Sequence, residues 1–114
     1  MKYLILNRKV QEVIHIGETI TMWVSGVTPL LTGGYDVKLE FQSDANIDIH
    51  YKGNNITTVN KDVTISIVET IDLMNGDYDI SLGFNAPSYI TIDRDEVRKR
   101  RIKNIDRAFN GSNI

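Results

Sequence analysis

The chain has 114 residues, 41% of them hydrophobic, and a formal net charge of −2. This length fits one compact domain with a modest core, and the hydrophobic content excludes disorder as the global state. The sequence has no Cys, which excludes disulfides, thiol nucleophiles and Cys-ligated metals and favours a cytoplasmic location. No apolar run is long enough to span a bilayer, and the N-terminal stretch MKYLILNRK is too short in apolar residues for a signal peptide.

The charge is distributed unevenly along the chain. Residues 1–27 carry three basic and two acidic side chains, residues 28–80 carry three Lys and nine acids, and residues 81–114 carry seven basic side chains and four acids. The three segments therefore have net charges of +1, −6 and +3. A polyanionic partner is expected to prefer the two ends of the chain over the middle.

Strand signals dominate in chain order. Alternating or β-branched segments occupy residues 3–7, 12–16, 19–27, 35–41, 46–51, 63–71, 78–84 and 89–93, and clusters of Gly, Asn and Asp separate them. One helix is predicted to begin near Asp93–Asp95, whose acids suit a helix N-terminus, and to run through residues 96–109 before a frayed tail. We therefore expect a mostly β protein with a C-terminal α-helix.

The chain contains an internal repeat. YDVKLEFQSDANIDIHY (35–51) aligns without a gap with YDISLGFNAPSYITIDR (78–94), and six of the 17 positions are identical. Residues 16–27 and 59–70 also share a hydrophobic alternation. The predicted order is one opening strand, four strands, four similar strands and the helix, which favours an internal duplication.

Signals for catalysis are absent from the sequence. His15 and His50 are far apart and lie on separate predicted strands, and there is no phosphate loop, nucleophile elbow or metal-ligand spacing. We expect a protein that is not an enzyme and needs no metal or cofactor.

Two predicted strands carry an aliphatic stripe that ends in Arg. The two-residue period of a strand places Ile90, Ile92 and Arg94 on one face, and it places Leu4, Leu6 and Arg8 on one face of the first strand. Paired side by side, these strands form an aliphatic ledge with a cationic rim, which suits a single-stranded RNA loop. The alternative interpretation is that the aliphatic side chains belong to the core and both Arg side chains are solvated.

Residues 4–27 together with residues 79–102 resemble the carbon storage regulator (CsrA/RsmA) family of bacterial RNA-binding proteins. The family pattern opens with a strand of the type L-I-L-[ST]-R-[RK]-x-G-E and ends with G-x-x-A-P, a strand, R-[ED]-E-[IV] and a helix. The positions that match are Leu6, Arg8, Lys9, Glu12, Ile16, Gly17, Gly26, Gly83, Ala86, Pro87, Ile92, Arg94, Glu96 and Val97.

The resemblance implies an intertwined dimer of five-stranded subunits, with each RNA site built from the first strand of one subunit and the last strand of the other. It implies binding of GGA-containing loops near ribosome-binding sites, in mRNA leaders or small regulatory RNAs. Carried over by position, the RNA-binding residues are Leu6, Asn7, Arg8, Lys9, Ile90, Ile92, Arg94 and Val97, with Arg94 the most critical of them.

The sequence departs from the family pattern at several positions. Asn7 replaces the usual Ser or Thr, Gln11 replaces the usual Gly, and Lys9 keeps the charge without the planar fork of Arg. A long interruption also separates Val27 from Asp77, where the family has a short turn.

The repeat offers an interpretation of this interruption. Residues 1–52 form one five-strand unit and residues 56–107 form a second unit without a first strand, so the chain is a single-chain pseudo-dimer with one intact RNA site. The competing arrangement is a family homodimer with a β-rich insertion. A different class of function is a degenerate protein-interaction module that pairs with or titrates a regular CsrA protein or its antagonist.

Overall fold

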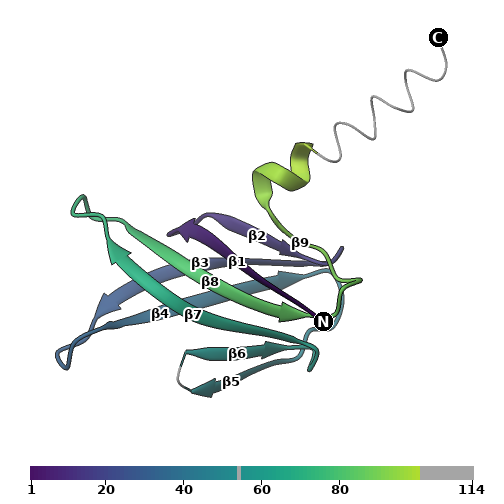
Figure 1. Ribbon diagram of the computed structural model, residues 1–114, viewed down its shortest axis with the longest axis horizontal. Helices are drawn as coiled ribbons and strands as arrows, with labels where there is room; N and C mark the ends of the chain where they lie inside the picture. Colours follow the sequence, from purple (N-terminus) through teal and green to yellow (C-terminus); the bar gives the residue numbers. More distant parts are fainter. Residues whose placement is uncertain (54, 101–114) are drawn as a thin grey trace, which may run out of the picture.

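The computed structural model describes residues 1–53 and 55–100 of the chain (Figure 1). They form a mostly β structure that ends in a helical segment over residues 95–100, as the sequence predicts, while the remainder of the predicted helix and the tail lie outside the described residues. The strands are β1 (Lys2–Lys9), β2 (Val13–Ile16), β3 (Ile20–Pro29), β4 (Tyr35–Ser43), β5 (Ile49–Gly53), β6 (Ile56–Val59), β7 (Val63–Asp72), β8 (Tyr78–Ala86) and β9 (Ile92–Arg94).

The strands form two antiparallel sheets that mix the two halves of the chain. The first sheet has the order β1-β8-β7-β6-β5, and the second has the order β4-β3-β2-β9. Strands β1 and β5 from the first half thus flank β8, β7 and β6 from the second half, while β9 joins the edge of β2. Figure 1 shows β1, β2 and β9 gathered near the helical segment and β5 and β6 on the other side of the molecule.

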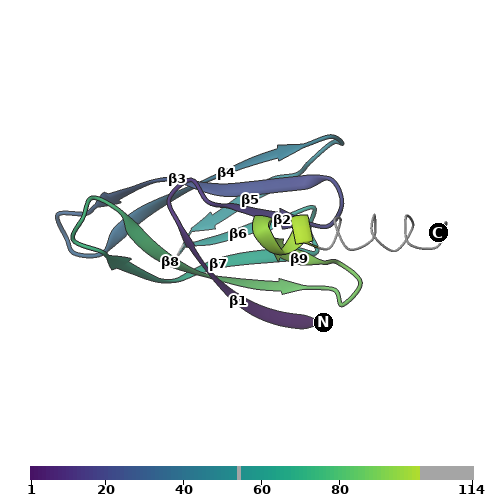
Figure 2. The same ribbon diagram turned by 90° about the horizontal axis from the view of Figure 1, so that it is seen from above.

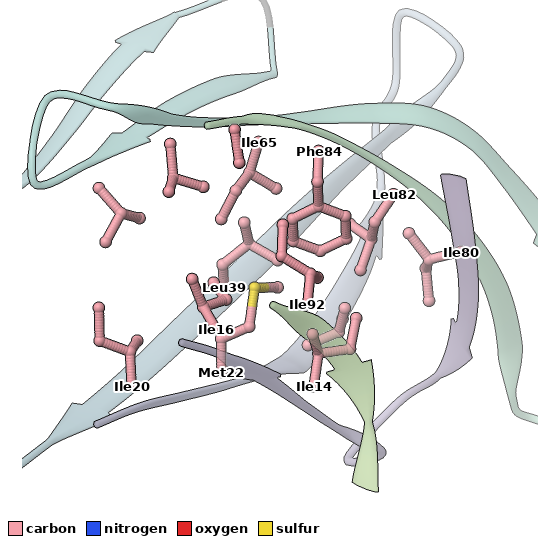
Figure 3. Packing of buried hydrophobic residues seen from close by; sticks show 14 residues of the cluster. Ile14, Ile16, Ile20, Met22, Leu39, Ile65, Ile80, Leu82, Phe84 and Ile92 are labelled. Atoms are coloured by element: carbon pink, nitrogen blue, oxygen red, sulfur yellow. The ribbon is translucent and has the colours of Figure 1, made fainter. Parts of the chain in front are cut away.

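The hydrophobic core lies between the two sheets (Figure 3). Because successive strand residues point to opposite faces, alternate residues of β8 face inward, and Ile80, Leu82 and Phe84 are all fully buried. They face Ile14 and Met22 of the second sheet. Full burial of each such side chain contributes about 1.5–3 kcal/mol to folding, so this layer of aliphatic residues holds the sheets together.

The two halves have the same strand pattern at a constant separation. Strands β2, β3 and β4 start at residues 13, 20 and 35, and β6, β7 and β8 start at residues 56, 63 and 78, so each pair is 43 residues apart. The pairs also have equal lengths, and both long hairpins have a register shift at the corresponding place, at Ser25 and Val68. The corresponding residues Tyr35 and Tyr78 meet edge to face, with ring centroids 5.4 Å apart.

Strand β6 is not among the individual strand signals in the sequence. It has only four residues, ITTV, and its two Thr residues are buried although they are polar. A short segment with Thr at its centre gives no hydrophobic alternation, so pairing with β5 and β7 defines it as a strand.

Candidate nucleic-acid interface

Strands β1 and β9 carry most of the predicted RNA-binding residues, and they lie in different sheets. Strand β1 pairs with β8, placing Arg8 opposite Ile80, and β9 pairs with β2, placing Arg94 opposite Ile14. The prediction that the two strands pair side by side is therefore wrong. Each is the edge strand of its own sheet among the described residues, and side chains join the two edges.

Arg8 makes that connection. Its guanidinium forms a bidentate ion pair with Glu96, in which all four N–O distances are 2.9–3.1 Å, and Glu12 lies 3.8 Å away. The Arg8 side chain is only 4% exposed, and its Nε is buried with no hydrogen-bond partner in the part of the chain that the structure describes. Arg8 therefore fastens the helical segment to β1, and the prediction that it forms part of an exposed cationic rim is wrong in this structure.

Further polar contacts hold the start of the helical segment against β2. Asp95 Oδ1 lies 2.8 Å from His15 Nε2, and Asp95 Oδ2 lies 3.0 Å from Lys99 Nζ. These hydrogen bonds, first the one with His15, lower the pKa of Asp95 from its ordinary value of 3.8. Arg98 donates to the Gly17 carbonyl at 2.8 Å and pairs with Glu18 at 3.0 Å.

The predicted aliphatic ledge faces the core instead of solvent. Ile92 is 6% exposed and belongs to the buried cluster, while Leu4, Leu6 and Ile90 are half-buried and pack against that cluster. On β1 the stripe shares one face, as predicted, but that face is the inner one. The stripe predicted for the last strand is wrong, because Ile90 lies in the turn before β9 and is not part of the strand. Direct side-chain contact between Ile92 and a bound RNA is therefore excluded in this conformation.

The outer face of β1 is accessible. Its alternation exposes Tyr3, Ile5, Asn7 and Lys9, and Tyr3 is 60% exposed. Asn7 accepts a hydrogen bond from Ser81 Oγ at 3.0 Å. Tyr3 and Ile5 are not among the residues predicted from the sequence, although the same two-residue period that groups Leu4 with Leu6 places them on the opposite face.

Arg94 and Val97 lie at the junction of β9 and the helical segment, and both are half-buried. The Arg94 Nε is buried without a hydrogen-bond partner among the described residues. One helical turn further, Lys99 and Arg100 are exposed. The residues gathered around this edge thus include Arg94, Lys99 and Arg100, and we call the region formed by β1, β9 and residues 95–100 the β1–β9 edge.

Gln11, in the turn between β1 and β2, has a left-handed backbone conformation. Its φ is 72°, in the left-handed region that favours Gly. Its backbone N–H donates to the Val24 carbonyl at 2.9 Å, and its side chain donates to the Ser25 carbonyl at 3.3 Å. Two hydrogen bonds to β3 therefore hold Gln11 in this conformation.

Comparisons with protein-family models, curated proteins and solved structures find no match to this chain. Within residues 1–53 and 55–100, no helix is long and apolar enough to cross a membrane, and no group of three or more His, Asp or Glu side chains has the arrangement of a metal site.

Proposed function

We propose that this chain is a non-catalytic RNA-binding regulator of translation that binds single-stranded or hairpin-loop RNA along the β1–β9 edge. The observation that supports the proposal most is the ion pair of Arg8 with Glu96, which ties β1 to the helical segment that follows β9. In the CsrA family, which the sequence resembles, the first and last strands form the RNA site. The target class that this resemblance implies is GGA-containing RNA near ribosome-binding sites.

In the proposed site, backbone groups at the strand edges bind RNA bases, and basic side chains bind RNA phosphates. Edge strands carry backbone N–H and C=O groups with no neighbouring strand, which suit hydrogen bonds to splayed bases. Lys9, Arg94, Lys99 and Arg100 provide charge for phosphates, and the exposed ring of Tyr3 provides a surface for base stacking. Occupancy of a ribosome-binding site by this complex blocks ribosome access.

We further propose that one chain is equivalent to a complete CsrA-like dimer. The constant separation of 43 residues between corresponding strands and the exchange of β5 and β9 between sheets both support this arrangement. Within residues 55–100, the second unit has no strand that corresponds to β1. One RNA site per chain follows, because only the β1–β9 edge combines a first strand with a last strand.

Binding to a GGA hairpin, measured by fluorescence anisotropy, tests the proposed function. A hairpin with the GGA replaced by CCU measures specificity. Arg94→Ala is expected to weaken binding by at least about tenfold, since a charge-assisted contact to RNA is worth about 1.5–3 kcal/mol. Lys52→Ala, on β5 in the acidic part of the chain, is the control and is expected to leave affinity unchanged. Undiminished affinity in Arg94→Ala contradicts the site.

A protein-interaction module remains the second candidate, and the ion pair of Arg8 favours it. A guanidinium that is already neutralised by Glu96 contributes less to phosphate binding than a free one. The same hairpin titration separates the two functions, because absence of specific RNA binding by the folded chain supports the module that pairs with a CsrA protein or its antagonist.

A further inference from the structure

The outer edge of β4 is unpaired among the described residues, whereas the corresponding edge of β8 is covered by β1. In Figure 2, β4 and β1 lie at opposite edges of the molecule. The first sheet has five strands and the second has four, so the second sheet is one strand short beside β4. An open strand edge of this kind is a template for pairing with another extended segment.

Burial differs between the covered edge and the open edge. Ile80 and its counterpart Val37 lie at the same place in β8 and β4, but Ile80 is fully buried and Val37 only partly so. Beside β4 a groove is lined by Val37, Leu39, Tyr51, Ile56 and Ile67. Asp36, Asn55 and Thr57 also line this groove, and Tyr51 is 67% exposed there, so an accessible aromatic ring lies near the unpaired backbone groups of β4.

The residues of β4 indicate the chemistry of the segment that fits. Strand β1 places Lys9 opposite Asp79 and Ile5 opposite Gly83 on β8. The corresponding residues of β4 are Asp36 and Glu40, both exposed. Opposite charges across neighbouring strands stabilise the pair, so basic side chains are favoured at both positions.

A ring like that of Tyr3 is disfavoured on this edge. Tyr3 lies so close to Gly83 that a Cβ added there would overlap its hydroxyl. Position 40, which corresponds to Gly83, has the long side chain of Glu. The inner face of the incoming strand, by contrast, meets Leu39 and Val37 and favours aliphatic residues.

We propose that the β4 edge binds an extended segment of a partner protein that has aliphatic side chains at alternate positions and basic side chains opposite Asp36 and Glu40, with an uncharged side chain opposite Lys38 between them. The segment adds a fifth strand to the second sheet, with its aliphatic residues over the groove and its basic residues opposite Asp36 and Glu40. This is β-strand addition, in which main-chain hydrogen bonds give affinity and alternate side chains give specificity. The proposal does not depend on RNA binding at the β1–β9 edge.

Two synthetic peptides with the sequence of residues 2–12 provide the probes. Both carry Tyr3→Ser and Arg8→Val, the latter because residue 8 would face Val37 in the groove. The first also carries Ile5→Lys, and the second also carries Ile5→Glu and Lys9→Glu. Fluorescence anisotropy with the full chain is expected to show saturable 1:1 binding of the first peptide and binding at least about tenfold weaker for the second, since two cross-strand charge pairs change from attraction to repulsion.

Two matched protein variants test whether the peptide contacts Tyr51. Tyr51→Lys is expected to weaken binding of the first peptide by about tenfold, because it removes apolar surface and adds a like charge. Tyr89→Lys makes the same change at a comparably exposed residue, 79% exposed, outside the groove and is expected to bind normally. Thermal melting of both variants is the control that checks whether they fold.

Hydrogen exchange decides which strand receives the peptide. The expected result is new protection in residues 35–43 with no change in residues 2–9. Faster exchange in residues 2–9 means that the peptide displaces β1 from β8, which overturns the proposal. Equal binding of the two peptides also overturns the proposal. Self-association of the free chain that Tyr51→Lys abolishes overturns it too, because the β4 edge then binds a second copy of the chain.

Discussion

Arg8 and Glu96, separated by 88 residues in sequence, form a bidentate ion pair that ties the first strand to the start of the C-terminal helical segment. The two partners differ in burial: the Arg8 side chain is 4% exposed, whereas the Glu96 side chain is 57% exposed. A buried guanidinium depends on its partner far more than an exposed carboxylate does.

Glu96→Gln is therefore expected to lower the free energy of unfolding by about 1–3 kcal/mol, because it leaves Arg8 buried with only Glu12 nearby. Urea unfolding measures the loss. The control is Glu18→Gln, which breaks the exposed pair with Arg98 and is expected to cost less than about 1 kcal/mol. Equal losses in the two variants contradict the anchoring role of Arg8.

The stability contributed by Asp95 is expected to depend on pH. Its folded-state pKa is lowered by the hydrogen bonds with His15 and Lys99, so its contribution is fully present above the ordinary value of 3.8 and is lost as the pH falls through the lowered value. Urea unfolding of wild type and Asp95→Asn is expected to show the largest difference near about pH 6 and a shrinking one toward about pH 2. A difference that does not change with pH refutes this linkage.

Gly83→Ala is expected to destabilise the pairing of β1 with β8. The added methyl overlaps the Tyr3 hydroxyl and lies 2.8 Å from Ser66 Oγ, so we expect a loss of about 1–3 kcal/mol. Thermal or urea unfolding measures it. Gly26→Ala is the control, because its Cβ meets nothing within 4 Å, and it should stay within about 0.5 kcal/mol of wild type. Addition of Tyr3→Ala should recover part of the loss.

The sequence predicts the strands well because alternation reports local geometry directly. The alternation of β1 grouped Leu4, Leu6 and Arg8 correctly on one face, and the acids near Asp95 marked the start of the helical segment. The grouping of Ile90 with Ile92 and Arg94 was wrong, because Ile90 lies in the turn before β9. Alternation does not report which face is buried, because that depends on the opposing sheet. The side chain of Ile92 was therefore assigned to an exposed surface although it belongs to the core.

The pairing of strands that are far apart in the sequence could not be predicted either, because it also depends on the three-dimensional fold. Residues that match in pattern, such as Arg8 and Arg94, suggested two strands side by side, but each strand pairs with a different neighbour. The choice between Glu96 and solvent as the partner of Arg8 depends on the path of the chain after β9. No local spacing encodes that path, so the ion pair could only be found in three dimensions.

Phosphate contacts by the helical segment are expected to appear as salt dependence. Lys99→Gln and Arg100→Gln remove exposed charges at the β1–β9 edge, and each should reduce the slope of log affinity against log salt by about 0.7, the value for one phosphate of a single strand. Affinities for the GGA hairpin at several salt concentrations measure this slope. Lys38→Gln on β4 is the control, and an equal reduction there contradicts binding at the β1–β9 edge.

We propose that one chain acts as a complete CsrA-like dimer with one RNA site. Size-exclusion chromatography with light scattering, performed on the full chain saturated with a GGA hairpin, tests it most directly. The account predicts a particle containing one chain of 12.9 kDa and one RNA. A particle with two chains and two RNA molecules contradicts it and supports a homodimer with an insertion.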